Sequence, residues 1–140
     1  MAPEEDPALR FRLAVIRLAR RIRQLKAVDE VTDAQLAVAA ELYDFGPATP
    51  GALADREGVS PPAINRTVNA LEERGYVRRV PDPADGRRVF VEITDAGHEL
   101  VAETRRRRNA WMEAEFAALG APDRAVMARA AELMEAMGRR

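Results

Sequence analysis

Apolar residues recur every three or four positions near the start of the chain. One stripe contains Phe11, Val15, Leu18, Ile22 and Leu25, and a second stripe beside it contains Leu9, Leu13 and Ile16. This spacing indicates an amphipathic helix, because one helical turn takes 3.6 residues. The pattern predicts a helix over 8–28 that is apolar over much of its circumference. Such a wide apolar surface suits a helix with two neighbours, for example its own domain and a second subunit.

The start of a second helix is marked by two capping signals. Thr32 and Gln35 form a Thr-x-x-Gln capping box, and Val31 and Leu36 occupy the two positions of a hydrophobic staple. The apolar pattern continues to Phe45 and is followed by Gly-Pro, so we expect this helix to end there.

Two shorter helices follow, each with its own cap. Thr49 and Ser60 each stand directly before a proline, a residue that fits the first helical position because its missing N–H is not needed there. Gly58 and Gly75 stand at the expected C-terminal ends. These signals predict helices over 50–57 and 61–74, joined by a three-residue turn.

After Gly75 the hydrophobic period changes from 3.6 to 2. Alternating valines on both sides of a Pro-Asp-Pro-Ala-Asp-Gly turn over 81–86 predict a β-hairpin with a six-residue tip. Thr94 or Asp95 then begins a helix over 95–118, and a last helix is expected over 122–137.

Composition narrows the function classes. The 140 residues contain no cysteine and one histidine, His98, so disulfides, thiol chemistry and a histidine-rich metal site are not expected, and we predict no cofactor. No apolar run is long enough to span a membrane, and the acidic start lacks the features of a signal peptide, which predicts a cytoplasmic protein. No nucleophile, carboxylate-pair or phosphate-loop constellation appears, so we do not expect an enzyme.

Net charge is −1, so bulk electrostatics alone does not indicate a nucleic-acid partner. The distribution of charge is more informative, because Lys26 is the only lysine and no acidic residue occurs between Ala8 and Val28. Arginine is favoured wherever planar, bidentate contact with phosphate or guanine is needed. A bias in genome base composition would produce the same excess of arginine.

The segment from 50 to 93 has the order helix, tight glycine turn, helix, hairpin, which is the pattern of a winged helix-turn-helix. On a helical wheel Ile64, Val68 and Leu71 share one face. Pro62, Arg66, Asn69 and Glu73 lie on the opposite face, with Asn65 at its flank. Arginine pairs with guanine and asparagine with adenine in the major groove, so this outward face is a candidate reading face. A merely solvated helix face remains the alternative.

The stretch from Leu53 to Leu100 resembles the MarR family of bacterial transcriptional regulators. The resemblance is carried by Leu71-x-x-x-Gly75, Asp85-x-Arg87 and Thr94-x-x-Gly97 taken together. It implies a mainly α fold with a small β-wing, a winged helix-turn-helix with N- and C-terminal dimerisation helices. The expected organisation is a single domain over 1–140, with a DNA-binding lobe over 30–94 and dimerisation helices over 8–28 and 95–138.

The resemblance also implies a homodimer that binds a pseudo-palindromic operator on double-stranded DNA, with Arg87 as the minor-groove arginine of the wing and Asp85 as its orienting partner. A turn-stabilising role for Asp85 is an alternative. Ser60 offers a phosphate site at the positive end of a helix dipole. The candidate DNA-contacting residues are Ser60, Pro62, Asn65, Arg66, Asn69, Arg78, Arg79, Asp85, Arg87 and Arg88.

Many members of this family are repressors that respond to small anionic or aromatic effectors, which bind between the dimer helices and the DNA-binding lobe. The candidate lining residues here are Phe11, Val15, Tyr43 and Trp111, with Arg17 or Arg21 as partners for a carboxylate. Aromatic residues at helical spacing are also common in protein cores.

Two further readings concern charge. Between 56 and 88 there are seven arginines and five acidic residues, so the net positive charge of this segment is small. The alternative hypothesis of a winged-helix module that binds another protein rather than DNA therefore stays open.

The run Arg105 to Arg108 covers all sides of one helical turn, and we expect some of these arginines to pair with Glu103 and Glu113. Contact of this run with phosphate is the less favoured reading.

Overall fold

The computed structural model describes residues 6–140, which contain six helices and one two-stranded antiparallel sheet. The elements are α1 (Pro7–Arg23), α2 (Asp33–Phe45), α3 (Pro50–Glu57), α4 (Pro61–Glu73), β1 (Val77–Pro81), β2 (Val89–Ile93), α5 (Asp95–Ala117) and α6 (Ala121–Gly138). The chain divides into two compact units, one up to Arg107 and one from Arg108 onward, and α5 runs through the boundary.

The predicted caps form as expected. Thr32 accepts a hydrogen bond from the Gln35 backbone N–H at 3.1 Å, and the Gln35 side chain accepts one from the Thr32 backbone N–H at 3.3 Å. Thr49 and Ser60 cap α3 and α4 in the same way, through the backbone N–H groups of Ala52 and Ala63. Each cap satisfies a backbone N–H that the first helical turn leaves without a partner, so the helix boundaries follow local sequence closely.

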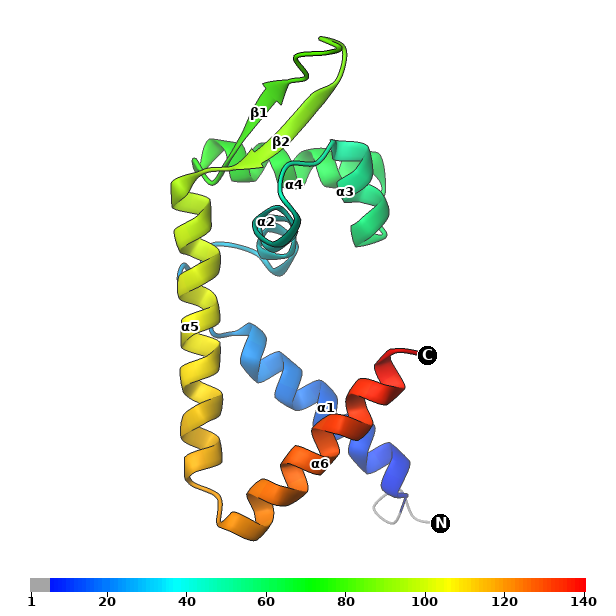
Figure 1. The fold of residues 1–140 in the computed structure, drawn as a ribbon, viewed down its shortest axis with the longest axis vertical. Coiled ribbons are helices and arrows are strands. Elements are labelled where there is room, and N and C mark those ends of the chain that lie inside the picture. The colour runs from blue at the N-terminus through cyan, green and yellow to red at the C-terminus, as the bar shows by residue number, and fades with distance from the viewer. Residues whose placement is uncertain (1–5) are drawn as a thin grey trace. The chain divides into compact units, whose positions relative to one another are not determined.

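Two apolar clusters form the core of the first unit. One joins α2, α3, α4 and the sheet, with Leu42, Leu53, Ile64, Leu71 and Val91 at its centre. The other packs α2 against the first half of α5. Figure 1 shows the hairpin of β1 and β2 beside α4, continuing directly into α5.

The hairpin differs from the prediction at its tip. Pro81 pairs with Val89 in the antiparallel register, so β1 extends one residue further than expected, β2 begins later, and the tip comprises the seven residues 82–88 rather than the six residues 81–86. Asp82 closes the tip, because its backbone N–H donates to the Arg88 carbonyl at 2.9 Å and its side chain accepts from the Ala84 N–H at 2.9 Å.

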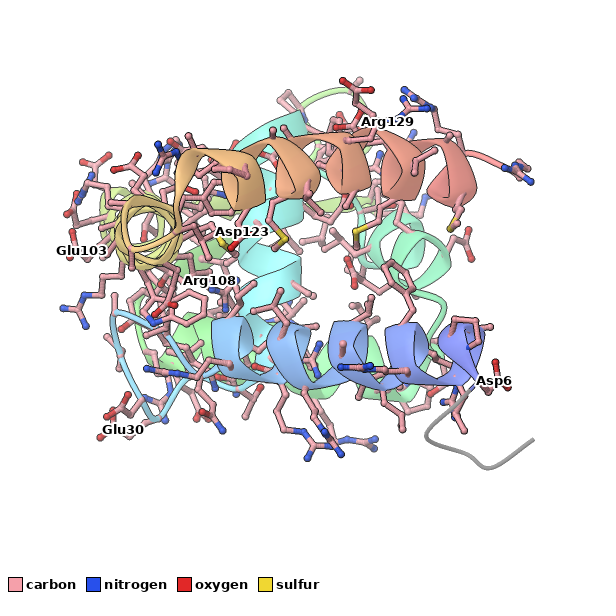
Figure 2. All side chains as sticks on the ribbon, turned by 90° about the horizontal axis from the view of Figure 1, so that it is seen from below. Asp6, Glu30, Glu103, Arg108, Asp123 and Arg129 are labelled. Carbon is pink, nitrogen blue, oxygen red and sulfur yellow. The ribbon has the colours of Figure 1, made fainter. Side chains whose placement is uncertain are left out.

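The first helix is shorter than predicted, since it ends at Arg23 and not at residue 28. Asp6 caps its start (Figure 2), accepting hydrogen bonds from two backbone N–H groups of the first turn. Beyond Arg23 the chain turns. The Ala27 N–H donates to the hydroxyl of Thr104 on α5 at 3.1 Å, and the Lys26 ammonium donates to the Val31 carbonyl at 2.9 Å. The contact with Thr104 replaces the hydrogen bond that the Ala27 N–H would have made to the Arg23 carbonyl in a helix continuing to residue 28.

Large apolar side chains remain exposed on α1 and on α6, each helix considered separately. On α1 they are Phe11, Leu13, Ile16 and Leu18, and on α6 they are Val126, Met127, Leu133, Met134 and Met137. Neither helix contributes a buried residue. Among residues 6–140, no helix combines the length and apolarity that crossing a bilayer requires.

Candidate nucleic-acid interface

The face of α4 opposite the core carries polar side chains. Ile64, Val68 and Leu71 are at most 1% exposed, as the helical wheel predicts, whereas Pro62, Asn65, Arg66 and Asn69 are exposed. Residues three or four apart share one side of a helix, so anchoring the apolar triplet in the core turns the polar set outward. The order of apolar and polar residues in α4 therefore determines which side chains face solvent.

Arg66 and Asn65 lie in the N-terminal half of α4. Within residues 6–140, neither side chain takes part in a hydrogen bond or an ion pair. Ser60 is already engaged as the cap of this helix, accepting from the Ala63 N–H at 3.3 Å. Asn65 and Arg66 are therefore available for an outside partner without breaking an internal contact.

Asn69 is not free in this way. Its side-chain oxygen accepts a hydrogen bond from the Arg79 guanidinium on β1 at 2.7 Å. The same guanidinium donates to Glu72 at 2.8 Å. Arg79, one of the predicted DNA-contacting residues, bridges the wing to the C-terminal half of α4 in the structure. Glu72 was not among the predicted residues, although it follows Asn69 by three positions and so lies on the same side of the helix.

The other arginines of the wing have partners of their own. Arg78 pairs with Glu92, its register partner on β2, at 3.1 Å. Arg88 lies 3.9 Å from Asp82 and above the ring of Phe90, with 5.5 Å between the guanidinium carbon and the ring centroid. These exposed ion pairs are weak and screened by salt, so they can exchange for phosphate contacts.

At the tip of the wing the side chain of Arg87 is 97% exposed. Asp85 accepts a hydrogen bond from the Arg87 backbone N–H at 3.1 Å, and its carboxylate lies 3.8 Å from the Arg87 side-chain Nε. Asp85 thus shapes the turn, as the alternative interpretation has it, and also lies near the guanidinium that it was expected to orient.

The residues predicted to line an effector site lie on three helices, α1, α2 and α5. Phe11, Val15, Arg17 and Arg21 lie on α1, where Val15 is half-buried and the others are exposed. Trp111 belongs to the second compact unit. Tyr43 on α2 packs against His98, with ring centroids 4.6 Å apart. A cavity predicted from these residues stays a prediction.

Tyr43 also lies beneath Arg105 of α5, with 5.1 Å between its ring centroid and the guanidinium carbon. Arg105 donates two hydrogen bonds to Asp44, at 2.7 and 2.8 Å, which hold the pKa of that carboxyl below its usual value. Arg106 and Arg107 both pair with Glu103, as predicted, and they lower its pKa. The link from Arg105 to Asp44 spans 61 positions, and no local signal in the sequence indicates it.

No group of three or more histidine, aspartate and glutamate side chains in residues 6–140 is arranged to hold a metal ion. The polar residues best placed to bind another molecule lie on the outward face of α4 and at the tip of the hairpin. A helix-turn-helix followed directly by a hairpin, with arginine and asparagine on the outer face of its second helix, defines a winged helix-turn-helix protein.

Comparison with known proteins confirms this class and identifies the family. A family model described as the MarR family matches residues 30–88. The chain is 41% identical over 125 residues to an uncharacterised HTH-type transcriptional regulator of Mycobacterium bovis, covering 89% of this chain and 87% of the relative. The chain belongs to the MarR family of transcriptional regulators, which is a DNA-binding family.

Two further similarities agree with this assignment. The crystal structure of a transcriptional regulator from Thermotoga maritima matches with a TM-score of 0.73 and 28% identity, covering 92% of this chain and 94% of that one. The HTH-type transcriptional repressor NicR of Pseudomonas putida is 35% identical over 81 residues, which is 57% of this chain and 51% of the relative. The predicted fold class, mainly α with a small β-wing, is confirmed.

Proposed function

We propose that this protein is a sequence-specific repressor that binds a pseudo-palindromic operator as a homodimer, with α4 in the major groove. The observation that carries the proposal is the pair Asn65 and Arg66, exposed near the start of α4 and engaged with no other group in residues 6–140. Side chains at this place in a recognition helix face base edges. Because neither has an internal partner to give up, a base contact costs only desolvation and side-chain entropy.

The wing supplies the second contact of the proposed complex. Arg87 projects from a hairpin tip and is almost fully exposed, which suits insertion of its guanidinium into a narrow minor groove, where the negative potential is strongest. Asp85 limits the conformations of the tip through its bond to the Arg87 backbone. The wing arginine therefore increases affinity and makes binding sensitive to the width of the minor groove, but it does not read individual bases.

The exposed apolar residues of α1 and α6 support the homodimer. Each helix, taken by itself, exposes four or five large apolar side chains, and exposed apolar surface of this kind commonly marks a protein–protein interface. Two copies of one chain cover the same surface on both by twofold symmetry, and the symmetry places two recognition helices on two half-sites about one helical turn apart. Size-exclusion chromatography with light scattering is expected to give about 31 kDa, twice the 15.5 kDa of the chain.

The DNA-binding proposal is tested by anisotropy titration of the purified protein against a randomised duplex pool, followed by sequencing of the retained DNA. An enriched palindrome is the expected result. With that operator, Arg66→Ala should relax base preference at one position by ~1–3 kcal/mol. Arg87→Ala should weaken binding to all sequences and reduce the salt slope by about 1. Arg129→Ala serves as the control, because Arg129 lies on α6 (Figure 2) and pairs with Glu132.

Two outcomes contradict the proposal. If the retained DNA shows no consensus, the protein binds backbone without reading sequence. If affinity does not change between low and high salt, the α4 face does not neutralise phosphates, since each neutralised phosphate contributes a slope of about −0.9. The second outcome favours the alternative of a protein-interaction module.

The finer part of this proposal is that the repressor responds to a small effector. NicR is named a repressor, and Arg17 on α1 makes no ion pair within residues 6–140, which leaves its charge available to a carboxylate. Salicylate is a suitable aromatic carboxylate probe. We expect it to weaken operator binding by about 5- to 150-fold. Arg17→Gln should reduce this effect. An operator affinity unchanged by salicylate would contradict a response to this effector.

A further inference from the structure

We propose that Arg79, held by Glu72, is a positioning residue that turns the amide of Asn69 so that this side chain reads DNA mainly as a hydrogen-bond donor and favours guanine over adenine. This inference rests on the proposed function. The relay consists of Glu72 and Asn69 on α4 and Arg79 on β1, and it joins the reading face to the base of the wing.

Three hydrogen bonds fix the relay. The Arg79 guanidinium donates to Glu72 Oε1 at 2.8 Å through Nη1 and to Asn69 Oδ1 at 2.7 Å through Nη2. The backbone N–H of Arg79 donates to the other Glu72 oxygen at 3.2 Å. Glu72 thus binds both the main chain and the side chain of Arg79. A long side chain held at both points loses little further freedom when its second guanidinium nitrogen meets Asn69.

The fold explains why Arg79 faces α4. Val77, two positions earlier on the same strand, is buried in the core between the sheet and the helices. Side chains two apart on a strand share one face, so Arg79 lies on the core-facing side, where α4 ends. Arg78 lies on the opposite face and pairs across the sheet with Glu92.

The orientation of the Asn69 amide follows from the chemistry of its partner. A guanidinium has five N–H donors and no acceptor, so the atom of Asn69 that faces it must be the carbonyl oxygen. The –NH2 group is then on the side away from Arg79 and keeps both of its donors. Asn69 is exposed, so these donors are accessible.

This orientation changes which base Asn69 prefers. The usual asparagine contact with adenine uses the amide oxygen to accept from the adenine amino group and the –NH2 to donate to N7. Here one lone pair of the oxygen is occupied, and the adjacent guanidinium repels the partial positive charge of an amino group. Guanine offers two acceptors, N7 and O6, which the –NH2 of Asn69 and the neighbouring cation both favour.

The experiment uses the operator selected by the wild-type protein. Asn69→Ala identifies the operator position that Asn69 reads, as the one position where base preference is lost. At that position wild type should prefer guanine, and Arg79→Ala should move the guanine-to-adenine affinity ratio at least about fivefold toward adenine, the low end of what a bidentate base contact contributes. Glu72→Ala should shift the ratio in the same direction, and the double variant should shift it no further than Arg79→Ala.

Glu30→Ala is the matched control, because Glu30 is exposed in the loop between α1 and α2 and makes no hydrogen bond or ion pair in residues 6–140. It removes the same charge away from the reading face and the wing, and it should leave the ratio unchanged. A role for Arg79 in phosphate contact alone would lower affinity equally for all sequences and leave the ratio unchanged. In free protein, the side-chain amide ¹⁵N–¹H signals of Asn69 should move in the Arg79→Ala and Glu72→Ala variants and stay in place in Glu30→Ala.

The outcomes separate this inference from the function on which it rests. If wild type selects no operator, the proposed function fails and the relay fails with it. If wild type selects an operator but Asn69→Ala alters no position, or if Arg79→Ala leaves the ratio unchanged, the relay alone is refuted. Amide signals of Asn69 that do not respond to Arg79→Ala would likewise refute the relay, whatever the DNA experiment gives.

Discussion

Gly97, in the first turn of α5, is the position where the fold leaves no room for even one methyl group. A Cβ added there would lie 2.2 Å from the carbonyl oxygen of Tyr76 and 2.6 Å from Cγ1 of Ile93. The oxygen is not free to move aside, because it accepts the Thr94 backbone N–H at 3.0 Å. Gly97→Ala must therefore push the start of α5 away from Tyr76 and Ile93.

The magnitude follows from three contributions. Relieving the overlap takes a displacement of roughly 1 Å or more, since unstrained carbon contacts lie at about 3.5–4.0 Å, and such overpacking costs about 1–3 kcal/mol. Weakening the hydrogen bond from Thr94 adds about 0.5–1.5 kcal/mol. Alanine returns up to about 1 kcal/mol through its higher helix propensity. We expect Gly97→Ala to lower the free energy of unfolding by about 2.5 kcal/mol, the sum of the middle of each range, within limits of about 0.5–4.5 kcal/mol.

The measurement is urea unfolding followed by circular dichroism, at one fixed protomer concentration because association contributes to stability. Gly51→Ala is the matched control, since Gly51 lies in helix α3 and an added Cβ would meet nothing within 4 Å. The control should be neutral or slightly stabilising. If Gly97→Ala unfolds within about 0.5 kcal/mol of wild type, the close approach of α5 to Tyr76 is not a rigid feature of the protein and the reasoning is wrong.

Substitutions at three further positions probe a buried hydrogen bond, the apolar core and the pKa of a glutamate. Thr104→Val leaves the Ala27 N–H without its acceptor and should lower the free energy of unfolding in urea by about 1–3 kcal/mol. Thr104→Ser keeps the hydroxyl and should lower it clearly less. Equal losses in the two variants would contradict the role of this bond. Leu71→Ala, at a fully buried position, should cost about 2–5 kcal/mol in the same assay, and a cost below 1 kcal/mol would be unexpected. Burial and the nearby charge of Glu41 raise the pKa of Glu57, so the folded state disfavours its charged form and this penalty grows as pH rises above the unfolded pKa. Glu57→Gln should therefore stabilise the protein at pH 7, and the gain should vanish below about pH 4, where glutamate is protonated in both states; a gain independent of pH would refute this cause.

Much of the site was predictable because the signals that build it are local. The cap residue, the proline after it and the apolar triplet of α4 lie within one short segment, and together they set where the helix begins and which face is buried. The exposure of Asn65 and Arg66 follows from that triplet alone. The exposure of Arg87 follows from its place in a hairpin tip rich in turn residues.

The partners of the charged side chains were less predictable. Adenine recognition by Asn69 was expected from its residue type, but its oxygen is bound by Arg79, which approaches from a strand that pairs only after the chain has turned. The contact of Arg105 with Asp44 was equally hard to predict, because it joins α5 to α2, two helices that pack side by side but lie far apart in the sequence. A long flexible side chain can pair with any of several neighbours, and the sequence spacing does not show which of them lies closest in the fold.

The sequence by itself determined the order of the elements, their caps, the buried face of α4 and membership of the MarR family, because each depends on residues within a few positions of one another or on similarity along the chain. Only the tertiary structure decided that α1 ends at Arg23, where Ala27 turns to meet Thr104, and that Gly97 must lack a side chain. Only the tertiary structure brought Glu72, Arg79 and Asn69 together. These features arise from contacts between segments distant in sequence, whose energies outweigh the local preference of the chain to continue a helix or leave a side chain in solvent.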